Sequence, residues 1–173
     1  MGVKVNRWPD DCYAGSLKES YRQWRCQQIT QLVQAVAREA KQLRPDIRIS
    51  AAVFSDYPAC RESVGQDWVS WVKAGYLDFI CPMDYTEDDR RFERLVKTQL
   101  EQIGGRIPMY PGIGAYRLDG PDRVVGQIAL ARQLGTQGFT IFDLNQHSPQ
   151  TIFPAVKAGA TRVKATPAHR GQR

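Results

Sequence analysis

Histidine and cysteine, the usual ligands of zinc, are scarce in this chain of 173 residues. It contains two histidines and four cysteines, and no two cysteines have the C-x-x-C spacing. We therefore expect no zinc site and no metal in the functional site. Cys12 and Cys60 fall in predicted loops and could form a disulfide, although spacing alone does not establish one. Cys81 is predicted to be a small buried residue.

Long apolar runs are also missing. No stretch approaches the length of a membrane span, and segment 1–7 lacks the apolar core of a signal peptide. We therefore predict no membrane span and no export signal within these residues. The chain on its own leaves the cellular location open.

Glycine-rich nucleotide-binding motifs are absent. No G-x-G-x-x-G or G-x-x-x-x-G-K-[ST] follows a predicted strand. Segment 110–114 has two glycines but neither the lysine nor the spacing of a phosphate loop, so we expect the glycines to turn the backbone sharply. These absences predict a function that uses no organic cofactor.

Positive charge is in excess, and its distribution decides what it implies. The net charge is +6, yet basic residues alternate with acids, as in segment 90–94, which is typical of solvated helix faces. Residues 160–173 form a short basic tail that we expect to be disordered. We predict no nucleic-acid partner; steeply salt-dependent DNA binding would favour that rival interpretation.

Strands and helices are predicted to alternate along the chain. Four apolar segments are predicted to be buried strands, and their starts lie about thirty residues apart, the size of one strand–helix unit. Ser16 and Glu19 form an S-x-x-E capping box for a first helix, whose apolar stripe runs to Leu43. The strands are predicted at 47–54, 77–81, 107–110 and 138–142, and the helices at 17–43, 67–74, 88–103, 121–134 and 148–159.

This order predicts an α/β fold with a parallel sheet covered by helices. An open doubly wound sheet and an eightfold barrel both fit the alternation, and the missing nucleotide motifs weaken the first. We therefore predict part of a (β/α) TIM-type barrel, with about four C-terminal strand–helix units in residues 17–159. Residues 1–16 are predicted to be a remnant of the preceding loop.

Carboxylates follow three of the four predicted strands. Asp56, Asp84 and Asp143 stand where a β/α barrel places its active site, with tyrosines close by. Carboxyl groups beside aromatic platforms favour sugar hydrolysis. Structural roles remain open, because Asp56 and Asp143 could cap turns and Asp67 could cap the helix that follows it, with Trp68 as a packing residue. His147 is predicted to be a loop residue at a helix start.

Several motifs in order resemble the glycosyl hydrolase-like family 10. They are Ala51–Phe54, the Q-D-W-x-x-W motif at 66–71, the segment 75–86 with P-M-D-Y, the P-G-I-G motif at 111–114, and Gly138–Phe139. The resemblance implies a β/α barrel and glycoside hydrolysis, often in exported or envelope-attached bacterial proteins that act on cell-wall or other polysaccharides. Their positions after predicted strands make Asp84, Asp143 and Asp56 the candidate catalytic carboxylates. The candidate sugar-binding residues are Gln66, Asp67, Trp68, Tyr85, Tyr110 and Tyr116.

One departure from the family pattern concerns the N-terminus. Family members carry an earlier strand that ends in an acidic motif, and segment 1–16 contains no such strand. We therefore expect the N-terminal half of the barrel to be a missing partner and this fragment alone to be inactive. The alternative is a carbohydrate-binding or scaffold module without catalysis.

Overall fold

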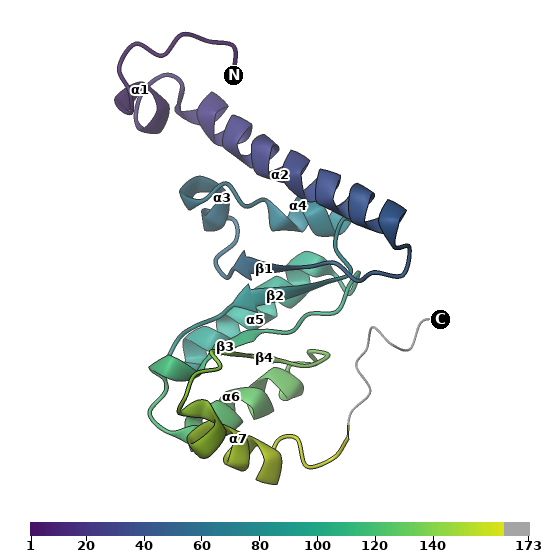
Figure 1. Cartoon of the computed structure of the whole chain (residues 1–173). Helices are drawn as coiled ribbons and strands as arrows, with labels where there is room; N and C mark the ends of the chain where they lie inside the picture. The colour runs from purple at the N-terminus through teal and green to yellow at the C-terminus, as the bar shows by residue number, and fades with distance from the viewer. Residues whose placement is uncertain (165–173) are drawn as a thin grey trace. The chain divides into compact units, whose positions relative to one another are not determined.

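The computed structural model describes residues 1–164 and divides into two compact units. Unit 1 comprises Met1–Ile47 and Asp56–Tyr76, and unit 2 comprises Arg48–Ser55 and the chain from Leu77 onward (Figure 1). Most of the predicted basic tail lies in residues 165–173, outside the described part of the chain. No helix among residues 1–164 is both long and apolar enough to cross a membrane.

Unit 1 is helical. Its helices are α1 (Asp10–Tyr13), α2 (Lys18–Leu43), α3 (Ala59–Ser63) and α4 (Trp68–Lys73). The predicted loop 1–16 therefore contains a helical turn. The predicted capping box is wrong: Leu17 holds the N-cap position without a side-chain bond, and Glu19 instead accepts hydrogen bonds from Arg22 and Gln23.

The interior of unit 1 differs from the predicted apolar stripe of α2. Only Cys26 and Ala37 of α2 are buried, whereas Leu32 and Leu43 are 63% and 89% exposed. The core is built instead around α4, where Trp71 donates a 2.8 Å hydrogen bond to Thr30 Oγ1 of α2. Of the cysteines, both members of the suggested Cys12–Cys60 pair are buried free thiols in short helices, so that disulfide does not form.

Unit 2 contains all the strands of residues 1–164, which form two parallel pairs of strands that are consecutive in the sequence. Strand β1 (Ser50–Phe54) pairs with β2 (Phe79–Met83), and β3 (Gly112–Gly114) pairs with β4 (Thr140–Phe142). A single bridge between Ile80 and Met109 joins the two pairs. The described strands do not close a barrel. The helical elements are α5 (Asp89–Ile103), the 3-10 turn η1 (Ala115–Arg117), α6 (Pro121–Gln133) and α7 (Ser148–Ala158).

The third strand lies further along the chain than predicted. Segment 107–110 makes only the bridge at Met109, and the regular strand is Gly112–Gly114, where a sharp turn was predicted. The glycines serve close approach instead. A Cβ atom on Gly112 would lie 2.8 Å from the Pro82 carbonyl oxygen, and one on Gly114 would lie 2.9 Å from Tyr85 Cβ.

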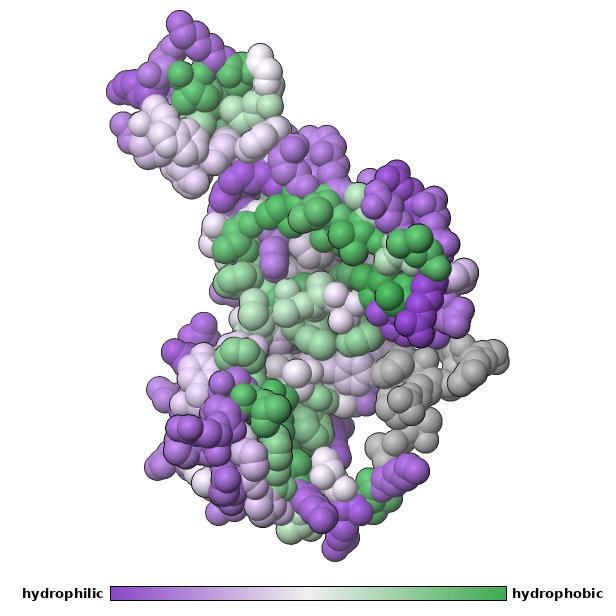
Figure 2. All heavy atoms as spheres, viewed as in Figure 1, coloured by the Kyte–Doolittle hydropathy of each residue, from purple (hydrophilic) through white to green (hydrophobic). Residues whose placement is uncertain are grey.

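The two faces of the strands differ in burial because side chains alternate along each strand. Val53, Ile80 and Ile113 are completely buried on the face that α5 and α6 cover (Figure 1). Most residues of the opposite face are exposed or half-buried, and we name it the open face. Figure 2 shows mainly hydrophobic and near-neutral residues over these strands. The open face consists of Ser50, Ala52, Phe54, Phe79, Cys81, Met83, Gly112, Gly114, Thr140 and Phe142.

Candidate functional site

Three aromatic rings meet where the strands of unit 2 end. Tyr85 stacks on Phe142 with ring centroids 5.1 Å apart, and Tyr116 packs edge-on against both rings at 6.0 and 5.9 Å. Phe142 is 48% exposed and Tyr116 is 57% exposed. We call these three residues the strand-end cluster. It offers partly solvent-exposed aromatic surface at the carboxyl ends of β2, β3 and β4.

Backbone contacts hold the strand-end cluster in place. The two glycines of β3 allow Tyr85 to lie directly on that strand, with Tyr85 Cε1 at 3.0 Å from the Cβ position of Gly112. Arg117 donates a 2.9 Å hydrogen bond to the carbonyl oxygen of Tyr85. The guanidinium of Arg117 also lies 5.9 Å from the centre of the Tyr116 ring. Arg117 therefore links two of the three cluster residues, through the backbone of Tyr85 and the ring of Tyr116.

Asp143 directly follows the cluster residue Phe142 and is half-buried. Its Oδ1 accepts a 3.2 Å hydrogen bond from Asn145 Nδ2, and its backbone carbonyl accepts one of 3.0 Å from Ser148 Oγ. Ser148 opens α7, so these bonds anchor the segment after β4 to that helix. Predicted as a loop residue, His147 is exposed and donates its backbone N–H to Asn145 Oδ1.

Asp84 lies on the other side of the strands from the cluster. Its side chain is completely buried, and Oδ1 accepts a 2.6 Å hydrogen bond from Gln99 Nε2 of α5. Oδ2 is buried without a hydrogen-bond partner. Burial raises the pKa of Asp84 to about 7, against a smaller lowering by the Gln99 bond. Tyr85, the next residue, lies instead against Gly112 and Gly114 on the open face, so these two consecutive side chains lie on opposite sides of the strands.

Tyr110 is also separate from the strand-end cluster. Its ring packs edge-on against Phe79, the first residue of β2, with centroids 5.3 Å apart. Gly138 leaves room for this ring, since a Cβ there would lie 2.7 Å from Tyr110 Cδ1. Tyr110 thus lies near the start of β2, whereas the cluster lies past the strand ends.

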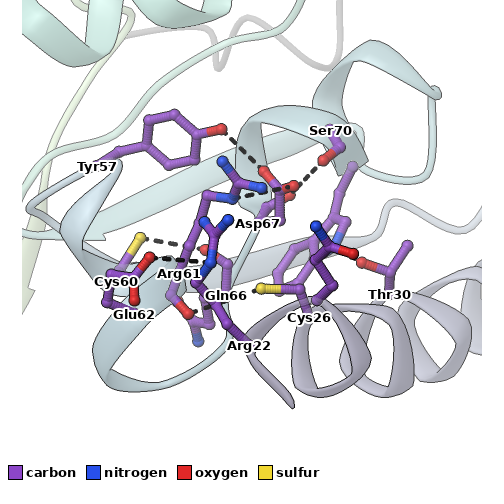
Figure 3. Close-up of polar contacts among 12 residues, drawn as sticks. Arg22, Cys26, Thr30, Tyr57, Cys60, Arg61, Glu62, Gln66, Asp67 and Ser70 are labelled. Atoms are coloured by element: carbon purple, nitrogen blue, oxygen red, sulfur yellow. Dashed lines mark hydrogen bonds and ion pairs between the residues drawn. The ribbon is translucent and has the colours of Figure 1, made fainter. Parts of the chain in front are cut away.

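The other predicted site residues belong to unit 1, where Asp67 is the centre of a polar network (Figure 3). Asp67 Oδ1 accepts a 2.9 Å hydrogen bond from the Tyr57 hydroxyl, and Oδ2 lies 3.4 Å from Arg61 Nε. Burial, followed by the bond to Asp67, raises the pKa of Tyr57 to about 12. Asp67 occupies the N-cap position of α4 but makes no side-chain cap bond, so its carboxylate fastens the segment between α3 and α4.

The neighbours of Asp67 have structural contacts of their own. Trp68 is completely buried and packs edge-on against Tyr57 at 5.2 Å. The carbonyl of Gln66 accepts a 3.2 Å bond from Cys60 Sγ, and burial raises the pKa of this thiol to about 11. Asp56 is exposed, and its backbone carbonyl accepts a bond from the N–H of Cys60. A shared site of these residues with Tyr85 stays a prediction.

Sequence reasoning missed one cluster residue, Phe142, and the neighbouring residue Arg117. Phe142 was treated only as the end of a strand, although Asp143 beside it was selected. Arg117 belongs to none of the sequence motifs considered above. Side chains alternate between the two faces of a strand, so Phe142 lies on the same face as Thr140. The same alternation places Tyr85 on the face of Cys81 and Met83 of β2, which is the open face.

The sequence of this chain matches a known family. The family described as Glycosyl hydrolase-like 10 matches residues 8–127, which is more than half of the chain. The match includes Asp84, Tyr85 and Tyr116 and ends before Phe142 and Asp143. No curated protein matches the chain. Within residues 1–164, no group of three histidine, cysteine or acidic side chains is arranged to hold a metal ion.

Proposed function

The chain belongs to the Glycosyl hydrolase-like 10 family, and from this premise we propose that unit 2 is part of a glycoside hydrolase domain that binds a polysaccharide at the strand-end cluster. The observation that carries the proposal is the partly exposed Tyr85–Tyr116–Phe142 cluster at the carboxyl ends of parallel strands. Aromatic rings with open surface can stack on the C–H faces of pyranose rings. Bacterial cell-wall glycan is one polysaccharide to test.

We assign the reacting carboxylate of this unit to Asp143. It follows the cluster and is partly accessible, whereas Asp84 has no solvent access. Asp84 then acts as a positioning residue: Gln99 bonds both its carboxyl group and the carbonyl of Ser55, at 2.6 and 3.0 Å, and so ties the ends of β1 and β2 to α5. Glycosidic cleavage generally needs a second carboxyl group, about 5 to 10 Å from the first.

We further propose that the four strand–helix units are part of a β/α barrel. Two parallel pairs of consecutive strands, joined by the Ile80–Met109 bridge and with helices on one face, support this proposal, since neighbouring parallel strands in a barrel follow one another in the sequence. The remaining strands would cover the open face and supply the second carboxyl group. A second candidate function, carbohydrate binding without cleavage, is favoured by the presence of one accessible carboxylate next to the cluster.

Replacing Phe142 by alanine is expected to lower the affinity for a bound oligosaccharide about tenfold, because the ring on which Tyr85 stacks is lost. Binding is measured by affinity electrophoresis in gels that contain cellulose derivatives, xylan, chitosan or soluble peptidoglycan strands. Phe153→Ala is the matched control, since Phe153 lies on α7 with a comparable exposure of 40%. Equal affinities of Phe142→Ala and wild type, or no binding to any of these polymers, would contradict the proposal.

The 173-residue chain alone is expected to bind polysaccharide without cleaving it, because cleavage generally needs two carboxyl groups at the site and we assign only Asp143 to it. The release of reducing ends from the same polymers is the measurement. Robust turnover by a monomer would show that the chain holds both carboxyl groups. In that case, loss of turnover in Asp143→Asn, with Asp119→Asn as the exposed control, would establish Asp143 as one of them.

A further inference from the structure

A second set of aromatic side chains gathers in unit 1, apart from the residues assigned above. Trp8 packs edge-on against Tyr13 and Tyr21 with centroids 6.0 and 5.7 Å apart, and Tyr21 stacks on Trp24 at 5.9 Å. Trp8 is 64% exposed, Tyr13 50% and Trp24 36%. We call these four residues the N-terminal aromatic patch. Isolated exposed aromatics are common, but a connected group of four is not explained by packing alone.

The patch borders a cavity of about 310 Å³ that is lined by Trp8, Tyr21 and Trp24, together with Cys12 and residues near the start of the chain that include Val3 and Val5. This is the lower end of the size range of small-molecule sites. A second pocket, of about 290 Å³, shares Cys12 with the first and is lined by charged groups that include Lys18, Arg25 and Glu62. Aromatic surface therefore adjoins hydrogen-bonding groups.

The patch is fixed by contacts from three helices. The Arg25 guanidinium lies 5.5 Å from the centre of the Tyr13 ring and 5.3 Å from that of Tyr21. It also donates hydrogen bonds to the carbonyls of Glu62 and Ser63 at the end of α3. A hydrogen bond with Tyr13 raises the pKa of the Tyr21 hydroxyl. The rings are thus held in place before any ligand arrives, which lowers the entropic cost of binding.

We propose that the N-terminal aromatic patch is a second carbohydrate-binding site, which stacks a pyranose ring on Trp8 and bonds its hydroxyl groups through the neighbouring charged pocket. A pyranose ring has two apolar C–H faces and hydroxyl groups around its edge. It can therefore stack on an aromatic ring and form hydrogen bonds with polar groups beside that ring. An aliphatic protein surface would leave Lys18, Arg25 and the tyrosine hydroxyls facing apolar groups, at a cost in free energy. The choice of a sugar as ligand rests on the proposed function.

Tryptophan fluorescence reports this site selectively. All four tryptophans belong to unit 1, and Trp68 and Trp71 are buried, with exposures of 0% and 2%. Acrylamide therefore quenches mainly the fluorescence of Trp8 and Trp24 in the 173-residue chain. The probes are cellotetraose, xylotetraose, chitotetraose and maltotetraose. At least one of them is expected to protect the exposed tryptophans from quenching.

Variants then locate the bound sugar. Trp8→Ala is expected to weaken protection of Trp24 at least about tenfold, whereas Trp8→Phe, which keeps a ring, stays within about threefold of wild type. Because Trp8 is largely exposed, neither change removes core packing. No protection by any tetrasaccharide, or equal protection in Trp8→Ala and wild type, would overturn the proposal. Protection that depends on protein concentration and not on sugar would show that a second copy occupies the patch, and also overturns it.

The Phe142→Ala variant separates this proposal from the proposed function. Protection of the tryptophans is expected to be unchanged in Phe142→Ala, since Phe142 belongs to unit 2. If Phe142→Ala abolishes protection, the sugar is bound through the strand-end cluster and the second site does not exist. If Trp8→Ala weakens protection while Phe142→Ala has no effect on polysaccharide binding, the second site stands and the strand-end proposal fails.

Discussion

Asp84→Asn is expected to make the chain more resistant to urea at pH 8 than the wild type, and to remove most of the loss of stability on going from pH 5 to pH 8. Burial raises the pKa of Asp84 from 3.8 to about 7. The folded chain therefore keeps this proton at pH values where the unfolded chain has released it. The stabilising contribution is fully present below pH 4 and is lost as the pH rises through 7.

The expected loss is roughly 3 kcal/mol in the free energy of unfolding between pH 5 and pH 8, at about 1.4 kcal/mol for each unit of pH below the folded pKa. Asparagine cannot ionise, keeps the Oδ1 acceptor for Gln99, and places its amide where Oδ2 already lacks a partner. Asp119→Asn is the control, because Asp119 is exposed. A variant that is less stable than the wild type at every pH would show that the Asp84 carboxylate is ionised and needed in that form.

The location of Asp84 also shows what the sequence could and could not predict. The alternation of strands and helices and most of their boundaries followed from apolar periodicity, helix caps and prolines. We did not predict on which side of the sheet a residue lies after the end of a strand, although the alternation of side chains along the strand would have predicted it. Ile80, Pro82 and Asp84 are all buried, while Phe79, Cys81 and Met83 are only half-buried, so the period of two continues past the strand.

The glycines of segment 112–114 mark a second limit. Their spacing was interpreted as a turn, because glycine most often relieves a local backbone constraint. The constraint here comes from Tyr85, which is distant in the sequence and lies on the strand that the glycines form. A contact of this kind depends on the packing of two strands, and periodicity within one segment carries no information about it. The burial predicted for the apolar residues of α2 was wrong for a similar reason. The side of a helix that is covered depends on the elements that pack against it, which the pattern within the helix does not specify.

The wild-type chain is expected to self-associate in solution through the open face. Parallel sheets are usually covered on both faces, whereas Ala52 and Phe54 of β1 and Phe142 of β4 are exposed. The outer edges of β1 and β4 are unpaired within the described residues, and such edges favour pairing with another chain. Size-exclusion chromatography with light scattering is expected to give masses above the 19.6 kDa of one chain.

Ala52→Glu is expected to return the chain to a monomer. Ala52 points into the open face opposite Cys81, so any partner that covers this face would bury the new carboxylate without a counter-charge. Burying an unpaired charge costs several kcal/mol, which weakens association by roughly a thousandfold or more. Ala129→Glu is the matched control, because Ala129 is an exposed residue of α6 on the helix side of the same unit. If the wild type is monomeric at high concentration, or both variants dissociate alike, the open face does not bind another protein surface, and the proposal that further strands of a barrel cover it loses its physical basis.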